Sequence, residues 1–135
     1  MQKFVKGDTI SLPAKKITQA MICEYADAAD DHNPLHIDEK FAKTTRYGGT
    51  IAHGMLSMAF IQELMVRTFG VDYLTRGALE VSFMAPVRPG DMIETTGKVT
   101  IADEKTGKLV LQIVSQNQEG EKVISAKCTL RAQEA

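Results

Sequence analysis

One short polar stretch carries the strongest signal for chemistry in this chain. Asp31-His32-Asn33-Pro34-Leu35-His36 combines an acid, two imidazoles, a carboxamide and a proline. Proline fixes its own φ angle and favours an extended conformation at Asn33, so we expect a loop of limited freedom and not a helix. Such a loop can bring Asp31 and His36 together as an acid/base pair for proton transfer. The alternative is a polar turn between two helices, and spacing alone leaves both interpretations equally open.

The elements before this stretch are expected to be a strand and a helix. Residues 8–17 alternate apolar and polar side chains as a strand does, and Pro13 confines that strand to an edge or a bulge. Thr18 is a suitable N-cap for a helix over residues 19–29. We expect this helix to bury one apolar face, formed by Met21, Ile22, Tyr25, Ala28 and Ala29.

Two further helices are expected after the polar stretch, and the second is the most apolar part of the chain. Asp38 can cap a short helix at residues 39–44, in which Phe41 and Ala42 pack inward. Residues 51–69 place apolar side chains in most directions around a helix, so other structure must surround that helix. Before Gln62 the apolar pattern is interrupted only at His53, Gly54 and Ser57, which all lie near the start of this helix.

From Gly77 onward the apolar residues recur with a period of two, which indicates strands. Short turns separate the expected strands, near residues 77–87, 93–101, 109–114 and 124–130. This pattern predicts an antiparallel meander. The fold class is therefore α+β, with an antiparallel sheet wrapped around a long central helix. One such sheet leaves an edge and a face uncovered, so we expect it to pair with a second copy of the chain.

Composition limits the classes of function. The 135 residues are expected to form a single domain, 1–135, and the net charge of −1 offers no basic stripe for nucleic acid. The sequence lacks an apolar run long enough for a membrane span or a signal peptide. Cys23 and Cys128 lie in apolar-patterned segments without metal-ligand spacing. We therefore expect buried free thiols, no metal site and a reducing, cytoplasmic location.

Three segments match the pattern of one known family, in the same order along the chain. Residues 25–42 contain a D-x-N-P-x-H core, and residues 51–56 read Ile-Ala-His-Gly-Met-Leu. Residues 83–91 add a weaker match, with Pro86-Val87 followed by Pro89-Gly90-Asp91. Together these segments resemble the MaoC-like (R)-specific enoyl-CoA hydratases.

The resemblance implies a hot-dog fold, a homodimer or higher assembly, and acyl-thioester substrates. The implied reaction is the reversible hydration of short- to medium-chain trans-2-enoyl-CoA to (R)-3-hydroxyacyl-CoA, without a cofactor. Two positions depart from the family. The family often has glycine where this chain has Asp30, and some members have a serine at the position of Gln62. Gln62 is thus expected to support the site from outside, with altered hydrogen bonding.

Hydration of an enoyl thioester needs an activated water at C3, a proton at C2, and stabilisation of the enolate-like oxygen. Asp31 and His36 flanking one water can perform the first two tasks, and the sequence leaves open which is the base and which the acid. Unpaired N–H groups at a helix N-terminus can perform the third. Gly54 would let a carbonyl approach its N–H closely, and the resemblance assigns this contact to the same position. The alternative is that Gly54 only allows another backbone to pack nearby.

Further residues are expected to support these three. His53 either lines the pocket or hydrogen-bonds a backbone carbonyl, His32 is exposed, and Asn33 holds the loop through bonds to the backbone. The candidates for contact with the acyl chain lie on the central helix: Met55, Leu56, Met58 and Ala59. For the phosphates of CoA the candidate is Arg88, with Lys98 and Arg46 as further choices, because the chain has no phosphate-binding glycine loop.

Two other functions fit the same fold. An acyl-CoA thioesterase would hydrolyse the thioester, although hydrolysis does not need a paired Asp31 and His36 on one pre-proline loop. A non-catalytic acyl-thioester-binding subunit would bind the substrate without turning it over. Acyl-carrier protein could also replace CoA as the carrier of the acyl group.

Overall fold

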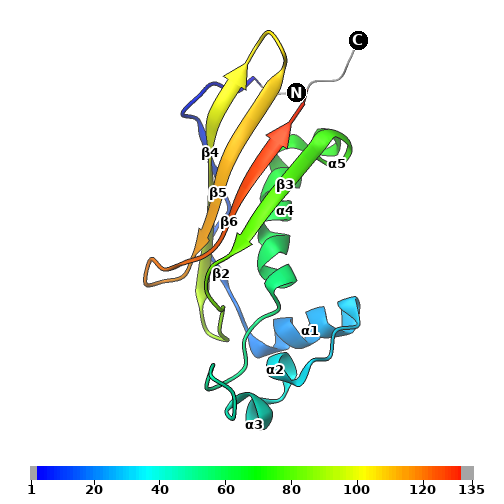
Figure 1. Ribbon diagram of the computed structural model, residues 1–135, viewed down its shortest axis with the longest axis vertical. Helices are drawn as coiled ribbons and strands as arrows, with labels where there is room; N and C mark the ends of the chain where they lie inside the picture. Colours follow the sequence, from blue (N-terminus) through cyan, green and yellow to red (C-terminus); the bar gives the residue numbers. More distant parts are fainter. Residues whose placement is uncertain (1–2, 132–135) are drawn as a thin grey trace.

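A twisted antiparallel sheet and one long helix, α4 (Gly54–Phe69), form the centre of the computed structural model, which describes residues 3–131 (Figure 1). The main strands lie in the order β1-β4-β5-β6-β3, and β2 pairs with β4. Their bounds are β1 (Thr9–Ser11), β2 (Lys15–Lys16), β3 (Gly77–Phe83), β4 (Met92–Asp103), β5 (Lys108–Gln116) and β6 (Lys122–Leu130). The expected α+β class, with a sheet packed around a central helix, is confirmed.

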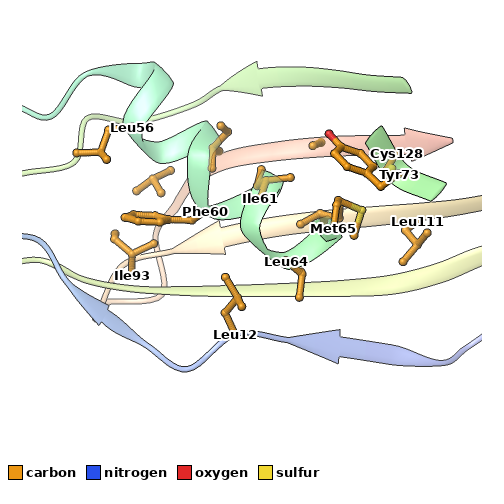
Figure 2. Close-up of a cluster of buried hydrophobic side chains, with 14 of the residues drawn as sticks. Leu12, Leu56, Phe60, Ile61, Leu64, Met65, Tyr73, Ile93, Leu111 and Cys128 are labelled. Carbon is orange, nitrogen blue, oxygen red and sulfur yellow. The ribbon is translucent and has the colours of Figure 1, made fainter. Parts of the chain in front are cut away.

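The hydrophobic core lies between α4 and the sheet (Figure 2). Helix α4 contributes Leu56, Phe60, Ile61, Leu64, Met65 and Phe69 to it. On β4, Ile93, Thr95, Gly97 and Val99 are buried while the residues between them are exposed, so the strand turns one face toward the helix. The period of two read from the sequence therefore corresponds to a sheet with one buried face.

The strand order differs from the predicted meander. Strands β4, β5 and β6 are consecutive neighbours, but β3 pairs with β6, with Leu79 opposite Cys128, and not with β4. Residues 84–91 connect β3 to β4 and contain Pro86 and Pro89, so they cannot form a tight hairpin. Alternation fixes which face of a strand is buried, but it does not fix the neighbour of that strand.

Several predicted elements have different bounds in the structure. The first strand is divided at Pro13 into β1 and β2, and the central helix begins at Gly54 and not at residue 51. The predicted strand over 77–87 ends at Phe83. The sequence also gave no indication of α5 (Val71–Arg76). Of the predicted single domain, residues 1–2 and 132–135 lie outside the described part of the chain, and its unity stays a prediction.

Three short helices lie beyond the end of the sheet at which α4 begins (Figure 1). They are α1 (Gln19–Ala29), α2 (Pro34–Ile37) and α3 (Glu39–Ala42). Thr18 caps α1 as predicted, because its Oγ1 accepts a hydrogen bond from the Met21 N–H at 3.1 Å. Asp38 caps α3 in the same way through the Phe41 N–H, also at 3.1 Å.

The burial predicted for these helices is only partly correct. Helix α1 buries Ile22 and Ala26, whereas Ala28 and Ala29 are exposed because they belong to its last turn, at its far end. In α3 only Ala42 is buried. The Phe41 side chain is 44% exposed, because a single turn at the periphery can direct only one of these positions inward. The prediction of an inward Phe41 is therefore wrong.

Both cysteines are free thiols, as expected. Cys128 on β6 is fully buried, and Cys23 on α1 is only half-buried. Within residues 3–131, no helix has the length and apolar character needed to cross a membrane.

Candidate active site

The polar stretch forms a turn and one helical turn between α1 and α3. Helix α2 begins at Pro34, so the expectation of a stretch without helix is wrong. Proline suits the first position of a helix because the N–H it lacks would have no partner there. Asn33 is the N-cap, and its Oδ1 accepts a hydrogen bond from the Leu35 N–H at 3.0 Å. The Asp31 carboxylate accepts a weaker one from the Asn33 N–H at 3.3 Å. Asn33 thus holds the backbone, as predicted.

Asp30 ends α1 in a left-handed conformation, with φ of 53°. Glycine adopts this conformation without strain, so the glycine that the family resemblance implies at this position has a physical reason. The Asp30 carboxylate is 96% exposed and lies 3.5 Å from Nδ1 of His32. It therefore points into solvent.

The structure brings Asp31 and His36 together. Nδ1 of His36 lies 2.7 Å from the carbonyl oxygen of Ile51. Because a carbonyl can only accept, Nδ1 carries the hydrogen, and Nε2 is left as the acceptor of the neutral ring. One carboxylate oxygen of Asp31, one ring nitrogen of His36 and one ring nitrogen of His53 lie within 4.8 Å of one another. The carboxylate and the two imidazoles thus form one cluster.

His53 is buried and bonded to protein groups. Its Nε2 lies 3.0 Å from the Asp31 carbonyl oxygen, and its side chain is among the buried polar groups, at 2% exposure. Its ring stacks on His36, with centroids 3.9 Å apart and planes at 29°, and the Tyr25 ring lies 4.9 Å away. The in-plane lone pairs of two stacked rings do not converge on one point, so the trio suits proton transfer better than a shared metal ion.

The first turn of α4 presents free donors beside this group. His53 is its N-cap but makes no capping bond with its side chain. The carbonyl of His53 accepts from the Leu56 N–H at 3.0 Å. Among the described residues no acceptor binds the N–H groups of Gly54 and Met55. These unpaired donors, at the positive end of a helix of 16 residues, form a suitable site for a developing oxyanion.

A cavity of about 490 Å³ adjoins this helix end. Its walls come from three segments: Arg46 and Tyr47; Ile51, Ala52, Gly54 and Ser57; and Phe83 to Val87 with Val123. Asp31 and His36 do not line it, but His36 hydrogen-bonds to Ile51, whose segment forms the cavity wall. Residues 51–54 therefore connect the two regions, because Ile51 and His53 contact His36 and Asp31 while Ile51, Ala52 and Gly54 line the cavity.

Gly54 is tightly packed on its cavity side. A Cβ atom at this position would lie 3.0 Å from Cε1 and 3.2 Å from Cδ1 of Phe83. The group beside Gly54 is therefore a side chain and not the backbone that the alternative interpretation anticipated. The absence of a side chain at Gly54 allows the Phe83 ring to pack against it, whether or not Gly54 also binds an oxyanion.

Other predicted site residues lie elsewhere. Gln62 accepts a hydrogen bond from the Tyr73 hydroxyl, and no bond joins it to residues 31–36 in the described part of the chain. The predicted acyl contacts do not line the cavity, nor does Arg88. Of these, Leu56 is in the core and Met55 is 53% exposed, while Met58 and Ala59 are half-buried. Their contact with substrate stays a prediction.

The structure adds residues that sequence reasoning did not assign to the site. Ser57 gave a signal, as a polar residue in an apolar helix, and it is buried at the cavity wall. The sequence contains no such signal for Tyr47, Phe83 and Met84. Their segments meet only because residues 84–91 cross the start of α4. A hydrogen bond of 2.7 Å from the Ala52 N–H to the Val87 carbonyl fixes that crossing.

Comparisons with known proteins agree with this architecture. A family model described as "MaoC like domain" matches residues 3–122. An (R)-specific enoyl-CoA hydratase of Rhodospirillum rubrum is 39% identical over 99 residues, which are 70% of this chain and 65% of the relative. A 3-hydroxybutyryl-CoA dehydratase of Methylorubrum extorquens is 34% identical over 93 residues, 66% of this chain and 55% of the relative. The chain thus spans less than two thirds of either relative.

A solved structure gives the same result at the level of the fold. The (R)-hydratase from A. caviae involved in PHA biosynthesis superimposes with a TM-score of 0.84 at 25% identity, covering 98% of this chain and 100% of that one. The sheet wrapped around α4 is accordingly a hot-dog fold. The family model covers most of the chain, and the chain therefore belongs to the MaoC-like domain family.

Proposed function

We propose that the protein catalyses the reversible hydration of trans-2-enoyl-CoA of short to medium chain length to (R)-3-hydroxyacyl-CoA. One observation carries the proposal: Asp31 and His36 are held together beside a helix end whose N–H groups are free. The names of the two curated relatives, a hydratase and a dehydratase, support the reaction class. The (R) configuration rests on the first of these relatives and on the solved hydratase.

The tautomer of His36 indicates which residue of the pair acts as the base. Nε2 is its free acceptor, so we assign it the proton of the attacking water, which Asp31 orients through a second hydrogen bond. The water oxygen then bonds to C3, and the electron pair of the double bond moves through C2 to the thioester oxygen. The proton held by the pair finally passes to C2, so no oxidant, reductant or cofactor is consumed.

The enolate-like oxygen would be bound at the start of α4. The N–H groups of Gly54 and Met55 are free to donate to it, and the helix dipole adds positive potential. The acyl chain would occupy the adjoining cavity, whose inner wall is formed by apolar residues such as Ala85, Val87 and Val123. A cavity of about 490 Å³ has the volume for a short or medium acyl chain.

Arg46 is the cation best placed for the phosphates of the carrier. It lines the cavity, is exposed, and makes no ion pair with an acidic residue in the described part of the chain. Its guanidinium lies 4.9 Å from the Tyr47 ring centroid and donates to the Tyr47 hydroxyl at 2.8 Å. The aromatic ring limits the conformations of the arginine, so less entropy is lost when it binds phosphate.

The free edge of the sheet supports a homodimer. In the described residues β3 pairs only with β6, and Phe83 and Met84 at its end are more than half exposed. An uncovered strand with apolar side chains is a surface that a second copy can cover by strand pairing. Sedimentation velocity over a range of concentrations would test this, and a monomer at all of them would refute it.

The reaction is tested by following loss of the enoyl-thioester absorbance with C4 to C12 trans-2-enoyl-CoA, with chiral analysis of the product. We expect hydration that Asp31→Asn and His36→Gln each reduce by about 100-fold or more, with unchanged thermal unfolding. A thiol-reactive dye reports the thioesterase alternative through release of free CoA. Binding of crotonyl-CoA without turnover would instead indicate a non-catalytic subunit. Wild-type rates in both variants would refute the assignment of the pair.

A further inference from the structure

His53 makes two contacts that the proposed reaction does not use directly. Its Nε2–H donates to the main-chain carbonyl of Asp31 at 3.0 Å, across 22 positions of sequence. Because that carbonyl can only accept, the hydrogen of the neutral ring must lie on Nε2. The start of α4 is thereby tied to the backbone that carries the carboxylate.

The second contact is with His36, the base of the proposed reaction. The His53 ring stacks on the His36 ring, with centroids 3.9 Å apart. The His36 ring is also held at its edge by the Nδ1–H bond to Ile51 at 2.7 Å. An edge contact alone leaves the ring free to tilt about that bond, and a face contact removes this freedom. The two together fix the direction in which His36 Nε2 points.

His53 is itself held from several sides and does not reach the cavity. It is 2% exposed, it does not line the cavity, and Tyr25 from α1 lies against it with ring centroids 4.9 Å apart. Its Nδ1 is buried without a partner in the described part of the chain. A buried nitrogen left without a partner costs stability, so a residue used only for packing would be expected to be apolar.

From these contacts we infer that His53 is a positioning residue, which sets the carboxylate of Asp31 and the ring of His36 relative to each other. It acts on Asp31 through its Nε2–H and on His36 through its ring face. This inference rests on the proposed hydration. Of the two sequence-based interpretations of His53, it extends the hydrogen bond to a backbone carbonyl, which the structure contains, and replaces the one in which His53 lines the substrate pocket.

Three variants separate the two contacts. His53→Gln retains a donor near the position of Nε2 but loses the ring, His53→Phe retains a ring but loses the donor, and His53→Ala loses both. A misplacement of about 1 Å in a reacting group can cost about 100-fold in rate, so we expect this loss of kcat in His53→Ala with KM nearly unchanged. Gln and Phe should each recover part of it. His32→Gln is the matched control, because His32 is an exposed histidine of the same stretch that pairs with Asp27.

The measurements are kcat and KM for crotonyl-CoA hydration, thermal unfolding, and the imidazole ¹⁵N spectrum of His36. The spectrum should show the Nδ1–H form in wild type and in His32→Gln, and the same form with broadened resonances in His53→Ala, because the ring keeps its bond to Ile51 but can tilt about it. A wild-type kcat in folded His53→Ala would overturn the inference, as would a loss of activity that only follows loss of folded protein. An unchanged KM in His53→Ala excludes a contact between His53 and substrate. A raised KM with wild-type kcat would instead indicate that His53 contacts substrate.

Failure of the proposed function would be recognised separately. If wild-type protein does not hydrate crotonyl-CoA, the reaction is wrong whatever the variants do. The ¹⁵N spectrum still tests positioning in that case, because it reports the His36 ring without substrate. An identical His36 spectrum in wild type and His53→Ala would overturn the positioning inference even if hydration were confirmed.

Discussion

Substitution of Gly54 by alanine distinguishes a role in binding the oxyanion from a role in packing. The new Cβ would lie 3.0 Å from Cε1 of Phe83. Carbon atoms in normal contact are about 3.5–4.0 Å apart, so the ring must move by roughly 0.5 Å or more. Phe83 is 57% exposed and is the last residue of β3, so it can rotate away. The methyl group and the displaced ring then both narrow the cavity beside the Gly54 N–H.

The expected effect on stability is small and the effect on rate is large. Moving one exposed ring should cost below about 1 kcal/mol, and the higher helix propensity of alanine offsets up to about 1 kcal/mol of this. The free energy of unfolding should therefore change by less than about 1 kcal/mol. Loss of one oxyanion donor typically costs about 3 kcal/mol of transition-state stabilisation, which corresponds to a decrease of about 100-fold in kcat/KM.

A double-mutant cycle with Phe83→Ala separates the causes. Phe83→Ala removes the ring that the new methyl group displaces, so the coupling in unfolding free energy between the two substitutions should be measurable. The loss of kcat/KM for crotonyl-CoA should persist in Gly54→Ala/Phe83→Ala, because the methyl group still blocks the N–H. Full recovery in the double variant would show that Gly54 is needed only for packing against Phe83. A wild-type rate in Gly54→Ala alone would refute the oxyanion role.

Three further predictions concern other parts of the chain. Asp30→Gly should raise the free energy of unfolding by about 1 kcal/mol, because glycine adopts the left-handed conformation at φ of 53° without strain. Asp30→Ala also removes the carboxylate but should not raise the free energy of unfolding. If urea unfolding shows the same increase for both variants, backbone strain is not the cause. Arg46→Gln should raise KM for crotonyl-CoA about tenfold and leave KM for crotonyl-pantetheine unchanged. If Arg88→Gln raises this KM and Arg46→Gln does not, Arg88 binds the phosphates, as the sequence analysis predicted. Burial raises the pKa of the Cys128 thiol from 9.0 to about 11, so its folded form holds a proton that the unfolded chain releases above pH 9. Stability should therefore fall as pH rises from about 9 to about 11, by roughly 3 kcal/mol more in wild type than in Cys128→Ala, and equal pH profiles in urea unfolding would contradict it.

Features that depend on neighbours in sequence could be predicted well. The bounds of α1 and the caps Thr18 and Asp38 follow from hydrogen bonds between residues three positions apart. The buried face of β4 follows from alternation within one strand. The proximity of Asp31 and His36 has the same origin, because five positions and one proline separate them. A single local pattern sufficed for the helix, its caps and the strand face, whereas for Asp31 and His36 the spacing alone had left a polar turn equally open.

Features that depend on distant segments could not be predicted. The pairing of β3 with β6 is decided by the path of residues 84–91 across the end of the sheet, and no local pattern encodes that path. The cavity is missed for the same reason, since Arg46 and Phe83 meet Gly54 only after the crossing is made. Exposure of Phe41 likewise depends on what lies beside α3, and not on the residues within it.

Ile51, Ala52 and His53 are consecutive positions that each hydrogen-bond to a different distant partner. The Ile51 carbonyl accepts from His36, the Ala52 N–H donates to Val87, and the His53 ring donates to Asp31. Adding or removing one residue in this run would shift every one of these pairings at once. Its length should therefore tolerate no change, whereas the turn at residues 104–107 between β4 and β5 can vary in length without affecting the site. Loop insertions that diversify the protein should accordingly accumulate at that end of the sheet.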